Sequence, residues 1–150
     1  MGGLADAFPD DIKKQFIDRN LKIGSVIRMI VPDTLPKPKI KRLIIVGADK
    51  DSVTFASVYI NTEINGNVIS DELLPLQFAI STNDRPYLEN DSFVDCSKLK
   101  ARSAEELSAA LSDNPAIHIG NVSDKDMTEI LSRLHSADTI SPKQKARFGL

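Results

Sequence analysis

The sequence predicts an α+β fold that is mainly β, with a small barrel or strongly bent sheet at its centre and helices at both ends. Short runs of β-branched and aromatic residues, separated by turn residues, recur between positions 24 and 100, and short, frequent strands are typical of small barrels. Outside that segment, apolar residues repeat at helical spacing. The 150 residues suit one domain. We therefore expect a single domain over 1–150, with an N-terminal helix in 1–23, a β core in 24–100 and a helical extension in 101–150.

The first helix is predicted to begin near Phe8. Pro9 suits an early helical position, and the carboxylates of Asp10 and Asp11 follow it, where negative charge is stabilised by the positive end of the helix dipole. Gly24 ends this helix.

Five or six short strands are expected in the β core, each bounded by turn residues. The clearest runs are residues 26–31, 43–46, 53–60, 76–80 and 93–96. Residues 32–38 contain three prolines, so we expect an irregular loop between the first two strands, ending in the basic run Lys37 to Arg42. Asn65-Gly66 predicts a long loop or small hairpin after the third strand.

The last third of the chain has helical spacing. Ser103 and Glu106 have the spacing of a capping box, Ser123 opens a second amphipathic helix, and Ser141 starts a short tail helix. The apolar stripe of the second helix is not interrupted by polar residues, which indicates a core contact rather than a cofactor site. These helices are expected to pack against the sheet.

Composition narrows the class of protein. Apolar residues make up 41% and charged residues 27%, which are average values for soluble globular domains. No apolar run approaches the roughly 18 residues of a membrane span, and residues 1–11 lack the pattern of a secretory signal. We therefore expect a cytoplasmic protein without a membrane partner. The single cysteine, Cys96, excludes an internal disulfide and a multi-cysteine metal site, and no metal or cofactor is expected.

Positive charge is concentrated in one short segment. The net charge of −2 argues against a generally basic, nucleic-acid-binding surface, so any polyanion site must be local. Four cations fall within six residues: Lys37, Lys39, Lys41 and Arg42. A solvated loop is the simpler interpretation of this run. The neighbouring prolines restrict the loop and lower the entropy lost on binding, but they also serve to end an edge strand.

Other reactive residues have simple structural interpretations. Cys96 lies in an apolar run, which favours a small buried hydrophobe over a nucleophile. Asp91 and Asp95 are typical of turns and strand edges. His118 is interpreted as a strand-edge imidazole, and His135 as a favourable partner for a helix C-terminus. No Gly-rich phosphate loop, zinc spacing or Gly-x-Ser-x-Gly elbow is present, but a metal-free nuclease needs none of these.

The order of several short motifs resembles the MazF/PemK-like family. Gly24-Ser25-Val26-Ile27 opens a strand, a basic residue precedes the next apolar strand, and Asn61-Thr62 ends another. The segment Leu88 to Ser97 is similar to a divergent branch in which a leucine and acidic residues lead into Asp-Ser-Phe-Val-Asp-Cys-Ser. The resemblance extends from Gly24 to Leu107.

This resemblance implies an SH3-like β-barrel with accessory helices, a homodimer, and an endoribonuclease that acts as the toxin of a toxin-antitoxin pair. Such enzymes cut single-stranded RNA without a metal ion, because the 2′-hydroxyl attacks its own phosphate with help from a base, an acid and a cation. The resemblance places the cation at Lys41 or Arg42 and a phosphate-binding hydroxyl at Thr62. An arginine there would donate charge-assisted bonds to the phosphate. The expected catalytic residues are Arg42, Thr62 and Asp95, and the expected RNA contacts are Lys37, Lys39, Lys41, Asn61 and Ser97.

One position departs from the family pattern. Ser97 stands where these toxins often have an acidic residue, and a serine cannot act as a carboxylate base. Asp95 projects to the same face if the strand is regular. Two functions therefore stay open: an RNA-cleaving toxin whose partner is a cognate antitoxin, and a barrel without catalysis that acts as a protein-binding or regulatory module.

Overall fold

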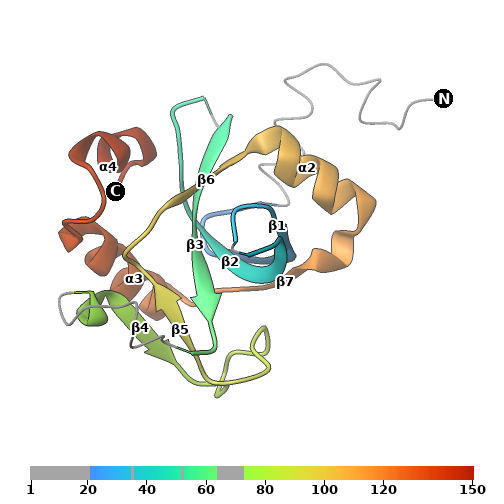
Figure 1. Cartoon of the computed structure of the whole chain (residues 1–150), viewed down its shortest axis with the longest axis horizontal. Coiled ribbons are helices and arrows are strands. Elements are labelled where there is room, and N and C mark those ends of the chain that lie inside the picture. Colours follow the sequence, from blue (N-terminus) through green and yellow to red (C-terminus); the bar gives the residue numbers. More distant parts are fainter. Residues whose placement is uncertain (1–20, 35, 52, 64–72) are drawn as a thin grey trace.

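A computed structural model describes residues 21–34, 36–51, 53–63 and 73–150. Within these ranges the chain forms one antiparallel sheet of seven strands and three α-helices (Figure 1). The expected α+β fold with mostly β structure is confirmed. The predicted first helix lies almost entirely outside the described residues, and so does the predicted turn at Asn65-Gly66.

The strands have these bounds: β1 (Ser25–Val31), β2 (Lys39–Ala48), β3 (Thr54–Asn61), β4 (Gln77–Ile80), β5 (Ser92–Asp95), β6 (Lys100–Ser103) and β7 (His118–Asn121). The helices are α2 (Ala104–Asp113), α3 (Asp124–Ser136) and α4 (Pro142–Phe148). Two 3₁₀ turns, η2 (Leu74–Leu76) and η3 (Pro115–Ile117), precede β4 and β7. In the described part of the chain, no helix is long and apolar enough to cross a membrane.

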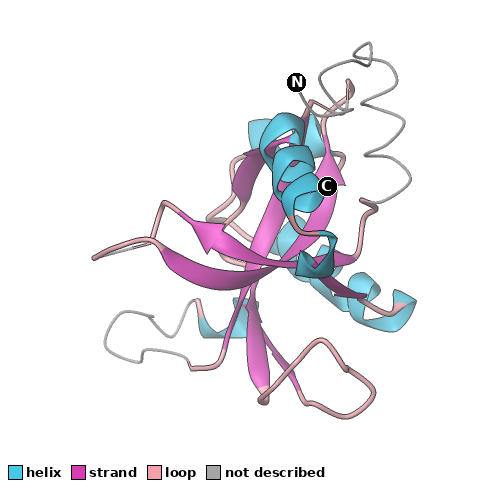
Figure 2. Ribbon diagram, turned by 90° about the vertical axis from the view of Figure 1, so that its right-hand side faces the viewer, coloured by secondary structure: helices cyan, strands magenta, loops and turns pink. Residues whose placement is uncertain are grey.

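The sheet curls at β3. Its strand order is β4-β5-β3-β2-β1-β7, and β6 also pairs with β3. The C-terminal residues Ile60 and Asn61 pair with β5, whereas the segment from Thr54 to Ser57 pairs with β6 on the edge away from β2. Because one edge of β3 pairs with two different strands, the sheet bends into a half-barrel. Its strands cross at steep angles in Figure 2.

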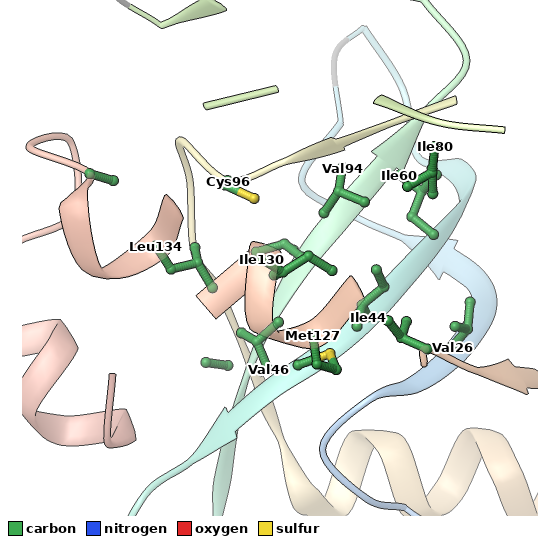
Figure 3. Close-up of a cluster of buried hydrophobic side chains, with 14 of the residues drawn as sticks. Val26, Ile44, Val46, Ile60, Ile80, Val94, Cys96, Met127, Ile130 and Leu134 are labelled. Atoms are coloured by element: carbon green, nitrogen blue, oxygen red, sulfur yellow. The ribbon is translucent and has the colours of Figure 1, made fainter. Parts of the chain in front are cut away.

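The strands β2 and β3 are apolar on both faces, so the sheet is buried from two sides. On one face, which we call the α3 core, Met127, Ile130 and Leu134 of α3 pack against strand residues such as Ile44 and Val94 (Figure 3). The other face, the α2 core, is covered by α2. It contains Ile27, Leu43, Ile45, Phe55, Tyr59, Leu107 and Leu111. The helices α2 and α3 accordingly lie on opposite sides of the sheet in Figure 1.

All three helices begin at the serines that the sequence predicts. The hydroxyl of Ser103 accepts a hydrogen bond from the Glu106 amide, and Ser123 and Ser141 make the same contact with the third residue after them. A side-chain acceptor at this position satisfies an amide that has no partner within its own helix.

The basic run is mostly strand, not loop. β2 begins at Lys39, where it pairs with Val31, and its pairing with β1 continues through Ile30 opposite Ile40. The expectation of a loop as far as Arg42 was therefore wrong, because the long cross-strand register continues β2 past the apolar run that marks it in the sequence. This correction matters for the site, since side chains in a strand alternate between faces.

Gly47 provides the contact surface for the C-terminal helix. It lies at a register shift between β2 and β3, and a Cβ at this position would lie 2.6 Å from the carbonyl oxygen of Phe148 and 3.2 Å from its Cβ. Phe148 is itself buried in the α3 core. The absence of a side chain at Gly47 therefore allows α4 to approach the sheet.

We expect Gly47→Ala to destabilise the protein by about 1–3 kcal/mol, the usual cost of forcing extra volume into a packed contact. The measurement is urea unfolding followed by circular dichroism. Gly149→Ala is the comparison: Gly149 has a positive φ of 72° but nothing within 4 Å of an added Cβ, so this change should cost backbone strain alone and no packing clash. An unchanged midpoint for Gly47→Ala would contradict the close docking of α4.

Candidate anion-binding site

Polar residues continue the face of the α2 core toward one end of β2 and β3. Leu43 is paired with Tyr59 across the two strands. Lys41 and Asn61 lie two positions farther along, so alternation places them on this same face. The Lys41 Nζ donates a hydrogen bond of 2.6 Å to the Asn61 Oδ1. The two residues thus form a polar pair next to Tyr59.

The ring of Tyr59 is surrounded by cations from two strands. The Nζ of Lys41 on β2, the Nζ of Lys100 on β6 and the guanidinium carbon of Arg102 on β6 each lie 5.7 Å from the ring centroid. This distance falls within the range of cation–π attraction. We call these four residues, together with Asp33, the Tyr59 cluster.

Asp33 lies in the connection between β1 and β2 and joins this connection to the cluster. Its Oδ1 accepts hydrogen bonds from the Tyr59 hydroxyl at 2.6 Å and from the Arg102 Nη2 at 2.8 Å. Its Oδ2 lies 3.2 Å from the Lys100 Nζ. One carboxylate is therefore bound by donors from β3 and β6, although 69 residues separate it from Arg102 along the chain.

The environment shifts the pKa of three groups in and around the cluster. Burial alone would raise the pKa of Asp33, but hydrogen bonds from Tyr59, Arg102 and Lys100 outweigh it and hold that pKa well below its usual range. Burial and the hydrogen bond to Asp33 raise the pKa of Tyr59, so its hydroxyl remains a donor. Burial and the charge of Lys39 lower the pKa of Lys41, while Asp95 opposes this shift.

Ionised Asp33 should make stability depend on pH in acid. Its folded pKa lies below its ordinary value of 3.8, so its contribution is complete above about pH 4 and is lost as the pH falls toward the folded pKa. We expect Asp33→Asn to show a smaller loss of unfolding free energy below pH 4 than the wild type. Denaturant unfolding at a series of pH values measures this. Asp51→Asn, at an exposed turn position, should follow the wild type. If the unfolding free energies of Asp33→Asn and of the wild type fall in parallel with pH, the acid dependence does not come from the lowered pKa of Asp33.

Arg102 is a buried cation with incomplete hydrogen bonding. Its side chain is 6% exposed, and its Nη2 also contacts the Tyr59 hydroxyl. Among the described residues its buried Nε has no hydrogen-bond partner. A buried cation needs paired acceptors. Arg102 has two carboxylate partners, Asp33 at 2.8 Å and Glu106 at 3.8 Å, and the shorter contact with Asp33 is the main one.

Asp95 and Ser97 form a local hydrogen-bonded unit at the end of β5. The Asp95 Oδ1 accepts from the Gln77 Nε2 at 2.7 Å, from the Ser97 amide at 3.0 Å and from the Ser97 hydroxyl. Gln77 pairs directly with Asp95 across β4 and β5. These bonds fix the orientation of the carboxylate, and Ser97 acts on it as a donor.

Lys41 and Arg42, the two alternatives for the phosphate-contacting cation, lie on opposite faces of β2. Arg42 shares its face with Ile44, on the side of the α3 core. Its Nε donates to the Tyr87 carbonyl at 3.1 Å, and its Nη2 lies 3.2 Å from a carboxylate oxygen of Glu89. Arg42 thus holds the 85–89 segment, whereas Lys41 belongs to the Tyr59 cluster.

Three other expected site residues are exposed on or next to the ends of β2 and β3. Thr62 is exposed immediately after Asn61, and Lys39 is exposed at the start of β2. Lys37 is exposed in the connection from β1, where its carbonyl accepts a 2.8 Å bond from the Thr34 hydroxyl. Lys41 and Asn61 are in direct contact, and Asp95 acts on Lys41 through its charge.

Sequence reasoning missed Asp33, Lys100 and Arg102. The alternation of Lys100 and Arg102 with Ala101 and Ser103 was the available signal for a short strand with both cations on one face. Nothing local in the sequence places that face beside Tyr59 or brings Asp33 to it, because these contacts arise from the curl of the sheet.

Cys96 does not take part in the site. It is fully buried in the α3 core, and burial raises the pKa of its thiol to about 12. The structural interpretation of this residue is therefore confirmed. In the ranges that the structure describes, no group of three or more His, Cys, Asp or Glu side chains could hold a metal ion.

Comparison with known proteins adds no family to this description. No protein-family model matches the chain, and no curated protein matches it.

Proposed function

We propose that this chain is a MazF/PemK-like protein with an SH3-like barrel, which binds single-stranded RNA at the Tyr59 cluster and cleaves it without a metal ion. The observation that carries the proposal is the group of three cations around one aromatic ring, next to the polar residues at the ends of β3 and β5. Cations that follow a phosphate backbone are typical of single-stranded nucleic-acid sites. The Tyr59 ring is buried, so its part in the proposed site is to hold the cations rather than to stack on a base.

Lys41 is the cation that this proposal places on the scissile phosphate. Its observed partner is the neutral amide of Asn61, whereas Lys100 and Arg102 are paired with the carboxylate of Asp33. A phosphate oxygen can take the place of the amide and form a stronger, charge-assisted bond. Asn61 and exposed Thr62 then lie beside the same phosphate, and Lys37 and Lys39 lie along the approach to it.

Asp95 is the base in this proposal. The three hydrogen bonds from Gln77 and Ser97 all reach its Oδ1, which leaves Oδ2 to accept the proton of the RNA 2′-hydroxyl. The 2′-oxygen attacks phosphorus as the bond to the 5′-oxygen breaks, which gives a 2′,3′-cyclic phosphate. Lys41 protonates the departing 5′-oxygen, and the lowered pKa of its ammonium group favours that transfer.

The experiment uses the purified full chain with a single-stranded RNA in the presence of EDTA. The expected products carry 2′,3′-cyclic phosphate and 5′-hydroxyl ends, and induced expression should arrest growth. As a toxin the protein would act in the cytoplasm, as a homodimer, and a cognate antitoxin would relieve the arrest. RNA that stays intact, both with the purified protein and in arrested cells, would overturn the proposal of cleavage.

A binding module without catalysis is the second candidate, and one observation favours it. Asp95 already accepts three hydrogen bonds from its own chain, and Arg42 is engaged with Glu89 and the Tyr87 carbonyl. The catalytic residues expected from the sequence are thus partly used for structure. Stable binding of RNA or of a protein partner, with no RNA turnover, would support this candidate over the nuclease.

A further inference from the structure

The contact between Asp33 and the Tyr59 cluster has the chemistry of an occupied anion site. A carboxylate accepts from a buried guanidinium, from an ammonium group and from a phenol hydroxyl. Phosphate oxygens accept the same donors with similar geometry. The carboxylate belongs to the connection between two strands rather than to a strand itself.

We propose that Arg102, Lys100 and the Tyr59 hydroxyl form a phosphate-binding site that Asp33 occupies in the free protein, and that an RNA phosphate replaces it on binding. The choice of RNA as the phosphate source rests on the proposed function. This site is separate from the one assigned to the scissile phosphate at Lys41, and Lys41 and Lys100 lie at the same distance from the Tyr59 ring.

The charge balance of the cluster favours such a replacement. Lys41, Lys100 and Arg102 supply three positive charges around the ring, against two negative charges, those of Asp33 and of Glu106, whose Oε1 lies 3.8 Å from the Arg102 Nη1. An additional anion is therefore attracted to the cluster even while Asp33 occupies it. The Nη2 of Arg102 already donates to Asp33, so a phosphate oxygen in the place of the carboxylate meets a donor that is oriented toward it.

Asp33 is also accessible to a competing ligand. Its side chain is 33% exposed, in contrast to Arg102, so an incoming phosphate reaches the contact from the solvent side. The donors stay in place on β3 and β6 when the carboxylate leaves, because Tyr59 and Arg102 are held within their strands. The site is thus preformed, which limits the ordering cost of binding.

In this arrangement Asp33 makes the site selective for a polynucleotide over inorganic phosphate. Inorganic phosphate must displace the carboxylate and makes no further contact that would strengthen its binding. A polynucleotide also contacts Lys41, which adds a second charged interaction. The wild-type protein is therefore expected to bind inorganic phosphate weakly and a single-stranded oligoribonucleotide more tightly.

Asp33→Ala tests the site directly. We expect inorganic phosphate to bind Asp33→Ala at least about tenfold more tightly than the wild type, measured by calorimetry and by the rise in melting temperature at constant ionic strength. Asp51→Ala removes an exposed carboxylate elsewhere and should bind phosphate as the wild type does. Adding Lys100→Met to Asp33→Ala should remove most of the increase in phosphate affinity, because it deletes one donor of the site.

The removal of Asp33 leaves the buried guanidinium of Arg102 with only its longer, 3.8 Å contact to Glu106, so this variant is expected to be less stable in chloride. If it does not fold in chloride, its recovery of circular dichroism in phosphate becomes the readout, and recovery is the expected result. Phosphate binding no tighter than in the wild type, or no recovery of the unfolded variant, would overturn the proposal.

A second arm separates this inference from the proposed function by using a single-stranded oligoribonucleotide. Tighter RNA binding by Asp33→Ala than by the wild type would support both the phosphate site and RNA as its ligand. Tight binding of inorganic phosphate, with no RNA binding by either protein, would retain the phosphate site and overturn RNA as its ligand. RNA binding by the wild type, with no effect of Asp33→Ala on either ligand, would overturn the inference alone.

Discussion

Lys41→Met is expected to weaken single-stranded RNA binding about tenfold and to slow RNA cleavage about a hundredfold, because it removes a charge-assisted contact that strengthens as charge grows on the phosphate. Methionine retains much of the unbranched stem, so packing beside Tyr59 changes little. Filter binding at fixed salt measures the first effect, and single-turnover cleavage in EDTA measures the second.

Two controls make this result specific. Lys50→Met removes an exposed cation from the turn after β2 and should leave binding and cleavage unchanged. Arg42→Ala should lower stability, because it releases the Tyr87 carbonyl and Glu89, but it should retain cleavage when folded. Full cleavage by Lys41→Met together with none by folded Arg42→Ala would instead assign the phosphate contact to Arg42.

Leu134→Ala is expected to destabilise the protein by about 2–5 kcal/mol, the usual cost of a cavity at a fully buried leucine. Leu134 is 0% exposed and joins α3 to the sheet within the α3 core. Urea unfolding followed by circular dichroism measures the change. Ser132→Ala, at an exposed position of the same helix, should change the unfolding free energy by less than about 0.5 kcal/mol.

The shape of that unfolding transition also tests the expected domain organisation. If residues 1–150 form one domain, Leu134→Ala should shift a single transition, because the helices pack on the two faces of one sheet. Loss of helical signal at low urea, with the sheet unfolding at the wild-type midpoint, would show that the helices unfold separately from the sheet.

The sequence predicted the central strands and the helix starts because their signals are local. A run such as Leu43 to Val46 must be buried wherever it lies, and a serine before an apolar repeat caps a helix whatever surrounds it. The strands β6 and β7 have four residues each and carry polar or half-exposed side chains. Their strand structure depends on pairing with β3 and β1, which no short window of sequence reports.

The candidate site was predictable only in part for a related reason. The contact between Lys41 and Asn61 follows from two adjacent strands, but the expected loop from Lys37 to Arg42 concealed that Lys41 and Arg42 point to opposite faces. The partners of Asp33 are brought to it by the tertiary fold, because β6 returns to pair with β3.

The salt dependence of RNA binding tests the central claim, that the Tyr59 cluster contacts RNA phosphates, most directly. Removing one cation that binds a phosphate of a single strand lowers the slope of log affinity against log salt by about 0.7. We predict that Lys41→Met and Lys100→Met each reduce the slope by about this amount, whereas Lys50→Met does not. Slopes identical to that of the wild type for both cluster variants would contradict the claim and place any RNA site elsewhere on the protein.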